Sequence, residues 1–444
     1  MDAREVALLT LNACERQGGW SDGVLKKQIA AAGLDSRDAG LATQLCFGVI
    51  QNRILLDFYL SKFSNIPLKR LEGKVLQALR LGLYQMLFLT RIPHSAAVDQ
   101  SVALTRAHCK NPRAPGMVNA ILRNLERSLD RLPTIPEDDP AEYYATLYSH
   151  PVWLVRELLE TLGSEGTAAF LQADNSQPPI TAMVNTVKTD LEGALEALQA
   201  EGVHGETHPW LKNCLVLSRS GSLEELEAFQ NGLFYVQDPA SRLAVLALDP
   251  GPGDRVLDMC AAPGGKSFAA AIQMRDQGEI WSCDLHPHKK TLIQKGAQRL
   301  GLTCIRPQTA DGKVRRPEWE GDFDRVLVDA PCSGLGVIRK KPDIRFKDPE
   351  PLAGLPQVQS AILDNAAGYV KPGGVLVYST CTILERENRA VTDAFLAAHP
   401  EFRRESFLLP GPAGEVSGGQ ITLWPQVHGT DGFYICKLRK DGEA

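Results

Sequence analysis

Two cysteines stand beside small and polar residues where the chain is expected to leave a buried strand. Cys332 lies in the run Asp329-Ala330-Pro331-Cys332-Ser333-Gly334, and Cys381 lies in Tyr378-Ser379-Thr380-Cys381-Thr382. A single cysteine at a strand end usually belongs to the core, but two of them, one after Asp-Ala-Pro, are harder to explain by packing. If the two strands are neighbours, both thiols share one cleft. A thiolate there could add to an electron-poor carbon and form a covalent intermediate.

Methylation at carbon 5 of cytosine is a reaction that needs such help, because that carbon is a poor nucleophile. A thiolate that adds at C6 turns C5 into an enamine-like carbanion equivalent, which can attack a sulfonium methyl group. A carboxyl group at Asp329 could hydrogen-bond the base ring and support the charge that develops there. A base must finally remove the C5 proton so that the thiol can leave. Cys332, Cys381 and Asp329 are therefore the candidate catalytic centre.

A glycine-rich loop from Asp258 to Ser267, with the sequence DMCAAPGGKS, follows an earlier strand and begins a helix. Its paired glycines let the backbone approach a ligand, and the helix N-terminus offers free N–H donors. The Gly265-Lys266-Ser267 tail resembles a P-loop, but Cys260 stands where that motif requires glycine. A GxGxxG fingerprint is also absent. The loop thus argues against both an NTPase and a dehydrogenase.

Two more acids follow strands in the same region. Asp284 ends the second strand, 19 residues after Gly265, where an acid can accept hydrogen bonds from two ribose hydroxyls. Asp311 follows the third strand and could hold an adenine amino group. A nucleoside-type cofactor without phosphates to bind fits the loop and both acids. S-adenosylmethionine is the candidate.

The patterns around these motifs predict a multi-domain chain. Apolar residues recur at helical spacing from Arg4 to about Ser128, which predicts an all-α domain of six or seven helices. Three prolines and three acids in residues 132–140 predict a linker. From residue 233, short apolar strands alternate with helices, which predicts a parallel α/β sheet with ligands at the strands' carboxyl ends. The predicted domains are 1–140, a small α+β module at 141–232, and 233–444, and the predicted strands of the last are 256–259, 280–284, 302–305, 325–329 and 374–379.

Composition and charge restrict the function classes. No apolar run approaches 18 residues and no signal peptide is recognisable, so we expect a cytoplasmic protein with no membrane span. No two of the 10 cysteines lie within four residues of each other, so no metal site is expected. The net charge of −5 divides into +4 over residues 1–140 and −9 over the remainder. A basic front end fits contact with a polyanion, although surface charge often serves solubility alone.

The motifs in residues 233–444 resemble the RNA 5-methylcytosine methyltransferase family, whose catalytic domain is a Rossmann-like class I methyltransferase fold. The resemblance includes Gln237-Asp238-Pro239-Ala240-Ser241 and His428-Gly429-Thr430-Asp431-Gly432-Phe433. It implies that Cys381 is the nucleophile and that Cys332 assists product release, whereas DNA cytosine methyltransferases attack with the Pro-Cys cysteine. The cofactor contacts that it implies are Cys260, Ala261, Ala262, Pro263, Gly264, Gly265, Lys266, Asp284, Asp311 and Asp329.

The first 130 residues resemble the helical RNA-binding NusB fold, through His94–Gln100 and Gly116–Arg123. A NusB-like domain joined to this catalytic domain is typical of bacterial enzymes that methylate cytosine in small-subunit rRNA. The resemblance therefore implies binding to small-subunit rRNA and a part in ribosome biogenesis. We expect a monomer, although no feature of the sequence specifies the oligomeric state. Basic residues beyond Cys332 are candidate phosphate contacts, although they could equally form a solvated loop: Arg339, Lys340, Lys341 and Arg345.

Two other classes remain open from the sequence. A DNA cytosine methyltransferase would need a large segment after the catalytic sheet to read DNA, and none is recognisable. A catalytically silent RNA-binding or assembly factor would not need both cysteines and all the cofactor acids. Loss of methyl transfer in Cys381→Ala would distinguish an enzyme from an assembly factor. Treatment of the labelled product with RNase or DNase would distinguish an RNA acceptor from a DNA acceptor.

Overall fold

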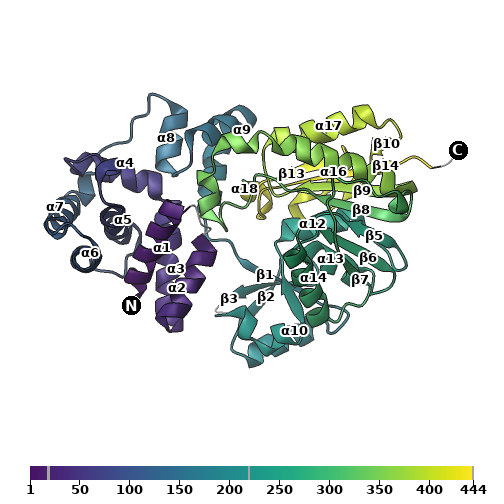
Figure 1. Cartoon of the computed structure of the whole chain (residues 1–444), viewed down its shortest axis with the longest axis horizontal. Coiled ribbons are helices and arrows are strands. Elements are labelled where there is room, and N and C mark those ends of the chain that lie inside the picture. The colour runs from purple at the N-terminus through teal and green to yellow at the C-terminus, as the bar shows by residue number, and fades with distance from the viewer. Residues whose placement is uncertain (18–20, 219–220, 443–444) are drawn as a thin grey trace. The chain divides into compact units, whose positions relative to one another are not determined.

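The computed structural model describes residues 1–17, 21–218 and 221–442, and the chain separates into two compact units (Figure 1). The first unit comprises Met1–Ser176 and Lys340–Lys347. The second comprises Gln177–Arg339 and Asp348–Ala444. A short segment from late in the chain, 340–347, therefore belongs to the helical unit. The domain limits at residues 140 and 232 stay predictions.

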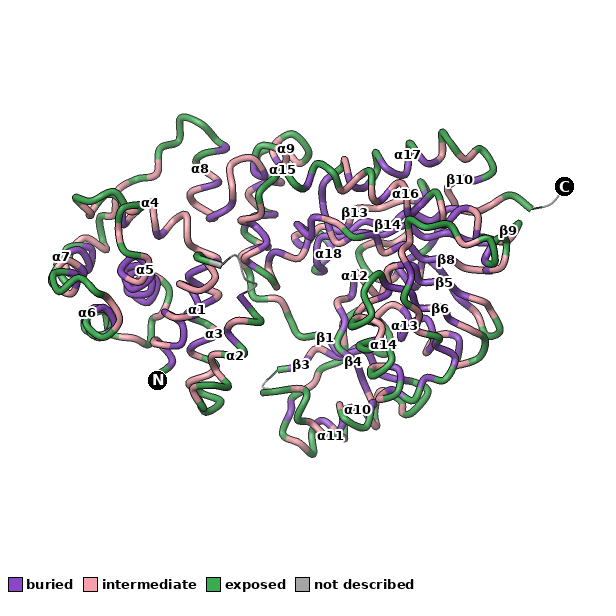
Figure 2. The backbone as a smooth tube through the Cα atoms, viewed as in Figure 1, coloured by how far each residue is buried: buried purple, intermediate pink, exposed green. Residues whose placement is uncertain are grey.

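Helices make up the first unit, as the periodicity predicts. Helix α5 is its centre, with every residue from Val75 to Met86 buried (Figure 2). Helix α3 approaches α5 closely, because a Cβ at Gly48 would lie 2.1 Å from the Tyr84 ring. The helices up to the linker are α1 (Ala3–Gln17), α2 (Ser21–Ala32), α3 (Ser36–Gln51), α4 (Arg53–Phe63), α5 (Gly73–Phe88), α6 (His94–His108) and α7 (Ala114–Glu126).

The first unit ends with two more helices. Helix α8 (Pro140–Leu147) begins at Asp139, whose side chain accepts hydrogen bonds from two backbone N–H groups of its first turn. Helix α9 (Val152–Asp174) is 23 residues long, and Gly163 breaks it with a φ of 68°. Gly163 thus divides α9 into two shorter helical stretches. The segment 340–347, which also belongs to this unit, contains the short 3-10 helix η5 (Pro342–Phe346).

The second unit begins with a small antiparallel sheet in the order β2-β3-β1-β4. Strand β2 carries no apolar alternation, with a mostly exposed surface, which explains why the sequence does not predict it. Strand β4 pairs with β1 although it lies beyond residue 232. The elements are β1 (Ile180–Val184), α10 (Leu191–Ala200), β2 (His204–Thr207), β3 (Cys214–Ser218), η3 (Leu223–Glu225), α11 (Glu227–Gln230) and β4 (Phe234–Val236).

A larger mixed sheet follows, in the order β10-β14-β9-β8-β5-β6-β7, with β13 also paired to β14. Its five strands from β7 to β9 are parallel, as predicted. Strands β10, β13 and β14 are antiparallel additions that the sequence reading does not include. The strands are β5 (Arg255–Asp258), β6 (Glu279–Asp284), β7 (Ile305–Thr309), β8 (Phe323–Asp329), β9 (Val370–Thr380), β10 (Phe402–Arg404), β13 (Gln420–Leu423) and β14 (Phe433–Lys440).

Helices cover both faces of the large sheet (Figure 1). Apolar residues of α12, α13 and α14 form one core with the sheet, and those of α16 and α17 form the other. The helices are α12 (Pro239–Leu248), α13 (Gly265–Gln273), α14 (Pro287–Leu300), α15 (Pro349–Leu352), α16 (Leu355–Tyr369), α17 (Arg389–Ala398) and α18 (Pro425–His428). The remaining short elements are η4 (Pro317–Trp319), η6 (Glu385–Glu387), β11 (Phe407–Leu408), η7 (Gly411–Ala413) and β12 (Glu415–Val416).

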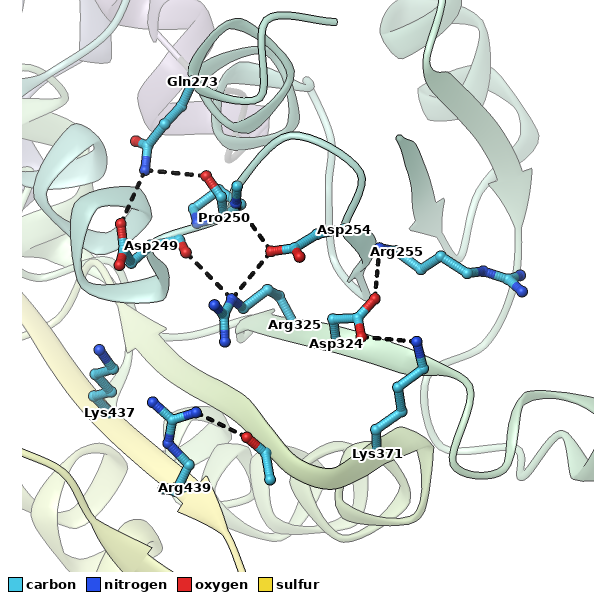
Figure 3. A network of polar contacts seen from close by, with 12 residues as sticks. Asp249, Pro250, Asp254, Arg255, Gln273, Asp324, Arg325, Lys371, Lys437 and Arg439 are labelled. Carbon is cyan, nitrogen blue, oxygen red and sulfur yellow. Dashed lines mark hydrogen bonds and ion pairs between the residues drawn. The ribbon is translucent and has the colours of Figure 1, made fainter. Parts of the chain in front are cut away.

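Charged side chains occupy the edge of the sheet where the parallel strands begin (Figure 3). Asp324 accepts a hydrogen bond from the N–H of Arg255 at 2.8 Å and from Lys371 at 2.7 Å. Arg325 donates to the carbonyl of Asp249 at 3.2 Å and lies 3.3 Å from Asp254. These partly exposed pairs contribute modestly to stability. The carboxyl ends of the strands lie at the opposite edge, where the candidate site is found.

Candidate active site

The thiols of Cys332 and Cys381 are in direct contact, with their sulfur atoms 3.3 Å apart. The loop of Cys332 follows β8, and Cys381 comes directly after β9. These two strands are parallel neighbours, with Asp329 opposite Ser379 in the register. Both thiols line a pocket of about 470 Å³. The tertiary structure therefore brings together the two cysteines that the sequence singles out.

The two thiols differ in their affinity for a proton. A hydrogen bond from Cys332 lowers the pKa of Cys381, and the positive charge of Lys266 lowers it further. The same hydrogen bond raises the pKa of Cys332, and burial adds to that increase. Because the charge of Lys266 favours a thiolate at Cys381, the pair shares one proton as a Cys332 thiol that donates to Cys381.

Alkylation should report this difference. At about pH 8, just below the usual thiol pKa, we expect iodoacetamide to label Cys381 because its lowered pKa leaves thiolate present. Cys109 is a control within the chain, since it is also partly exposed but burial raises its pKa to about 11. Peptide mass spectrometry over a pH series gives both profiles. Equal labelling of Cys381 and Cys109 at every pH would contradict the assignment.

Asp329 and Lys266 form an ion pair beside the thiols. The Lys266 ammonium lies 2.7 Å from Oδ2 of Asp329, and the hydroxyl of Ser379 donates to Oδ1 at 2.8 Å. Burial opposes the charge on Lys266, but Asp329 outweighs it and raises the pKa of the ammonium above its usual value. Lys266 is therefore a fixed positive charge at the thiol pair.

The loop before Lys266 has the backbone that a close ligand approach requires. Gly264 adopts a φ of 113°, and a Cβ there would lie 2.4 Å from the Phe268 ring. Helix α13 begins at Gly265, so its first N–H groups face the loop. Residues of this loop, with Asp238 and Ser241, line a pocket of about 200 Å³. The loop predicted from Cys260 to Lys266 is thus assembled around a cavity.

Asp284 and Asp311 line the larger pocket together with the two cysteines. Asp284 is buried, and its carboxylate lies 3.3 Å from the Lys289 ammonium and accepts from the N–H of Ala262 at 3.3 Å. Asp311 accepts from the N–H of Lys313 at 2.9 Å. The larger and smaller pockets share Cys260, Ala262 and Asp329 in their linings. One elongated ligand could therefore contact the loop and both acids.

Asp258 is a candidate site residue that the sequence reading does not select. Burial raises its pKa to about 7, and Ser267 donates to its Oδ2 at 2.7 Å. Its Oδ1 is buried without a hydrogen-bond partner, and the residue lines the smaller pocket. A buried acceptor of this kind fits the amino group of a ligand. Its position at the end of a strand, like Asp284 and Asp329, is the signal that could have identified it.

Arg339 is not available for the phosphate contact that the sequence predicts. Its guanidinium donates to Asp431 at 2.7 Å and lies 3.6 Å from Asp238, and its side chain is only 5% exposed. The N–H of Asp431 also bonds to Asp238 at 3.3 Å. Arg339 therefore joins the loop after Cys332 to two other motifs, because a buried guanidinium requires carboxylate partners. Its role is to hold the site together.

Arg345 also differs from the prediction. Its side chain is fully buried in the first unit, where it donates to the carbonyls of Gln51 at 2.8 Å and Ser149 at 2.9 Å. A third bond goes to the side-chain oxygen of Asn175 at 3.0 Å. A phosphate cannot reach a guanidinium enclosed in this way. Of the four predicted contacts, Lys340 is half-buried and Lys341 is exposed.

We expect Arg345→Met to destabilise the first unit by about 3 kcal/mol, because it leaves one buried and two partly buried acceptors without their donor. Hydrogen–deuterium exchange of peptides from α3 and α9 measures this locally. Arg37→Met is the matched control, because Arg37 lies exposed on α3. Unchanged protection of α3 and α9 in Arg345→Met would show that the guanidinium is not needed for stability.

Other site classes receive no support from the part of the chain that the structure describes. No group of three or more potential metal ligands occurs among the described residues. Within the same residues, no helix is both long and apolar enough to cross a membrane.

Three family models match the sequence. The NusB family model matches residues 1–127, and a ferredoxin-like domain of RsmF/B-like methyltransferases matches residues 150–224. The model described as 16S rRNA methyltransferase RsmB/F matches residues 245–439. This last match contains the thiol pair, the glycine-rich loop and the acids at the strand ends.

Curated relatives match over nearly the whole chain. The Bacillus subtilis protein named "Probable ribosomal RNA small subunit methyltransferase B" is 40% identical over 446 residues, covering 99% of each chain. The "Ribosomal RNA small subunit methyltransferase B" of Klebsiella pneumoniae is 34% identical over 413 residues, covering 92% of this chain and 91% of the relative. Among solved structures, PH0851 has a TM-score of 0.81 at 26% identity and covers 99% of each chain. The similarity therefore includes the helical unit as well as the catalytic sheet.

Proposed function

The chain belongs to the ribosomal RNA small subunit methyltransferase B family, and from that premise we propose that it methylates carbon 5 of one cytosine in 16S rRNA. The contact between Cys332 and Cys381 carries the proposal, because it provides a thiolate together with a second thiol at one point. Methylation of an exocyclic amino group or of a ribose hydroxyl would need neither. The remaining site residues support the same reaction.

Cys381 is the proposed nucleophile. Its thiolate adds to C6 of the cytosine, which forms the C6–S bond and moves electron density to C5. The base must leave its stack to present C6 to the sulfur. Asp329, held between Lys266 and Ser379, is oriented to hydrogen-bond the ring as charge develops. Lys266 maintains a positive charge near the sulfur, which favours the thiolate before the addition.

Cys332 is proposed to assist release. After methylation, C5 carries both the new methyl group and its original hydrogen. Removal of that hydrogen as a proton re-forms the C5–C6 double bond and breaks the C6–S bond, which returns Cys381 as a thiolate. The Cys332 sulfur lies 3.3 Å from the Cys381 sulfur, so it is close to this carbon pair when the adduct exists. Once Cys381 is bound in the adduct, Cys332 can release its own proton to solvent, and the resulting thiolate is the group we assign to removal of the C5 proton.

S-adenosylmethionine is the proposed methyl donor, whose sulfonium supplies the methyl group when bound and leaves S-adenosylhomocysteine. Asp284 would hold the ribose and Asp311 the adenine amino group, since both line the larger pocket. The loop from Cys260 to Lys266 would enclose the amino-acid end. The unpartnered Oδ1 of Asp258 fits the amino group there.

The RNA is proposed to contact Lys340 and Lys341 as well as the pocket, and the helical domain is proposed to add RNA affinity as in NusB-like folds. Lys341 has the exposure that a phosphate contact needs, whereas Arg339 and Arg345 do not. The protein is proposed to act as a monomer in the cytoplasm, during ribosome biogenesis.

Transfer from labelled S-adenosylmethionine to protein-free 16S rRNA tests the proposal. The label is expected in 5-methylcytidine after digestion to nucleosides, and it should be sensitive to RNase but not to DNase. Parallel reactions with 23S rRNA and with small ribosomal subunits define the acceptor. Label in any other nucleoside would contradict the proposed chemistry, and label in DNA would contradict the proposed acceptor. No label in any of these acceptors would contradict the assignment as an active enzyme.

A further inference from the structure

A buried carboxyl group contacts the loop of Cys332. Glu387, in η6, is fully buried. Its Oε2 accepts the backbone N–H of Ser333, the residue next to Cys332, at 2.9 Å. The side-chain N–H group of Gln359 donates to the same oxygen at 2.9 Å and to the carbonyl of Pro331 at 3.0 Å. Glu387 and Gln359 thus hold both flanks of Cys332.

The other oxygen of this carboxyl group, Oε1, is buried without a hydrogen-bond partner. A loop support alone would not require a charge at this position, because a glutamine could accept the same two N–H bonds. A buried carboxyl oxygen without a partner is costly, which indicates a use beyond support.

The charges around the two thiols are arranged unequally. Lys266 lowers the pKa of Cys381, whereas Glu387 contributes to the raised pKa of Cys332. Asp329 raises the pKa of both thiols, so it does not favour a proton on one over the other. The titratable groups around the pair are Asp329 on β8, Lys266 on α13, Tyr378 on β9, Glu387 on η6 and Asp431 before β14.

We propose that Glu387 is a positioning residue whose negative charge keeps the shared proton on Cys332, so that Cys381 is the thiolate. The inference rests on the proposed roles of the two cysteines and adds the reason for them. Either thiol could be the nucleophile by position alone, since their sulfurs are in contact. Glu387, bonded to the residue next to Cys332, and Lys266, whose charge acts on Cys381, distinguish the two thiols. A negative charge stabilises the protonated neighbour, and a positive charge stabilises the thiolate.

Site-resolved alkylation of the full chain tests this without RNA or methyl donor. Wild type and Glu387→Gln are treated with iodoacetamide at about pH 8, and the ratio of labelled Cys332 to labelled Cys381 is measured by mass spectrometry. Glutamine keeps an oxygen for Ser333 and Gln359 and removes only the charge. We expect the ratio to rise about tenfold, because a nearby charge shifts a pKa by at least about one unit.

Gln359→Met is the matched control, because it removes both bridging hydrogen bonds and leaves the Glu387 charge in place. Its labelling should remain on Cys381. An unchanged ratio in Glu387→Gln, or an equal change in Gln359→Met, would overturn the proposal. A thermal melt of each variant shows whether it is folded. Glu387→Asp retains the charge, so its labelling should stay on Cys381 where that of Glu387→Gln shifts to Cys332. Failure of RNA methylation would leave these ratios unaffected, so the two proposals fail separately.

Discussion

Alanine at Cys381 is expected to lower methyl transfer to 16S rRNA by a factor of at least about 10⁴, because removing a covalent nucleophile eliminates the main reaction path. The variant should also form no covalent complex with RNA. Alanine at Cys332 is expected to behave differently, since the first addition needs only Cys381. A protein–RNA complex that survives denaturing electrophoresis should accumulate, with little released product. Label transfer and gel mobility measure the two effects.

The control for both variants is Cys304→Ala. Cys304 is buried immediately before β7, at the edge of the sheet opposite the thiol pair, and its loss should leave methyl transfer unchanged. The reverse pattern, with an active Cys381→Ala and no adduct in Cys332→Ala, would assign the nucleophile to Cys332. That result would also contradict the proton position inferred from Lys266 and Glu387.

Alanine at Gly336 should cost about 3 kcal/mol of stability and displace the Cys332 loop. A Cβ at this position would lie 1.8 Å from the carbonyl oxygen of Gly432, which is backbone and cannot rotate away. Gly336 also donates to the carbonyl of Cys381 at 2.9 Å, and its own carbonyl accepts from Gly432 at 2.8 Å. Relief of the clash therefore moves both thiol-bearing segments. We expect a lower midpoint of thermal unfolding and a large loss of methyl transfer.

Gly354→Ala provides the comparison. Gly354 precedes α16 with an ordinary φ of −85°, and the nearest atom to an added Cβ is 4.0 Å away. This substitution should leave both the melting midpoint and the activity close to wild type. Near-wild-type behaviour of Gly336→Ala would show that the contact between the Cys332 loop and Gly432 relaxes without consequence for the site.

Short contiguous motifs explain how much of the site could be predicted. The two thiol motifs and the glycine-rich loop each consist of a strand end and the candidate site residues that follow it directly. Residues of one motif are therefore close in space whatever the rest of the fold. The parallel strands β5, β6, β8 and β9 then follow from their apolar runs and bring the motifs to one edge. The sequence places the third strand at 302–305, but the strand lies at Ile305–Thr309. The prediction misses it because its central residues are polar and give no apolar run.

The added antiparallel strands were harder to recognise. Strand β14 lies between β9 and β10 and is almost fully buried. Its sequence nevertheless includes lysine and arginine, which are unusual in a buried strand. Strand β4 has only three residues and pairs with a partner about 50 residues earlier, which no local pattern reveals. Pairings of this range depend on the assembled sheet and not on local preference.

By itself, the sequence singled out the thiols, the loop and the acids as candidates, because their residue types and spacing indicate what chemistry each could perform. Only the tertiary structure decided which charged side chains can reach a ligand and which are bonded to other residues of the protein. Arg345 looks like a phosphate ligand in the sequence, but its partners Gln51, Ser149 and Asn175 are far away along the chain. Glu387 carries no local signal in the sequence, and only folding buries it beside Ser333. Burial and long-range hydrogen bonds set the cost and the effect of each charge, and neither is visible before the chain is folded.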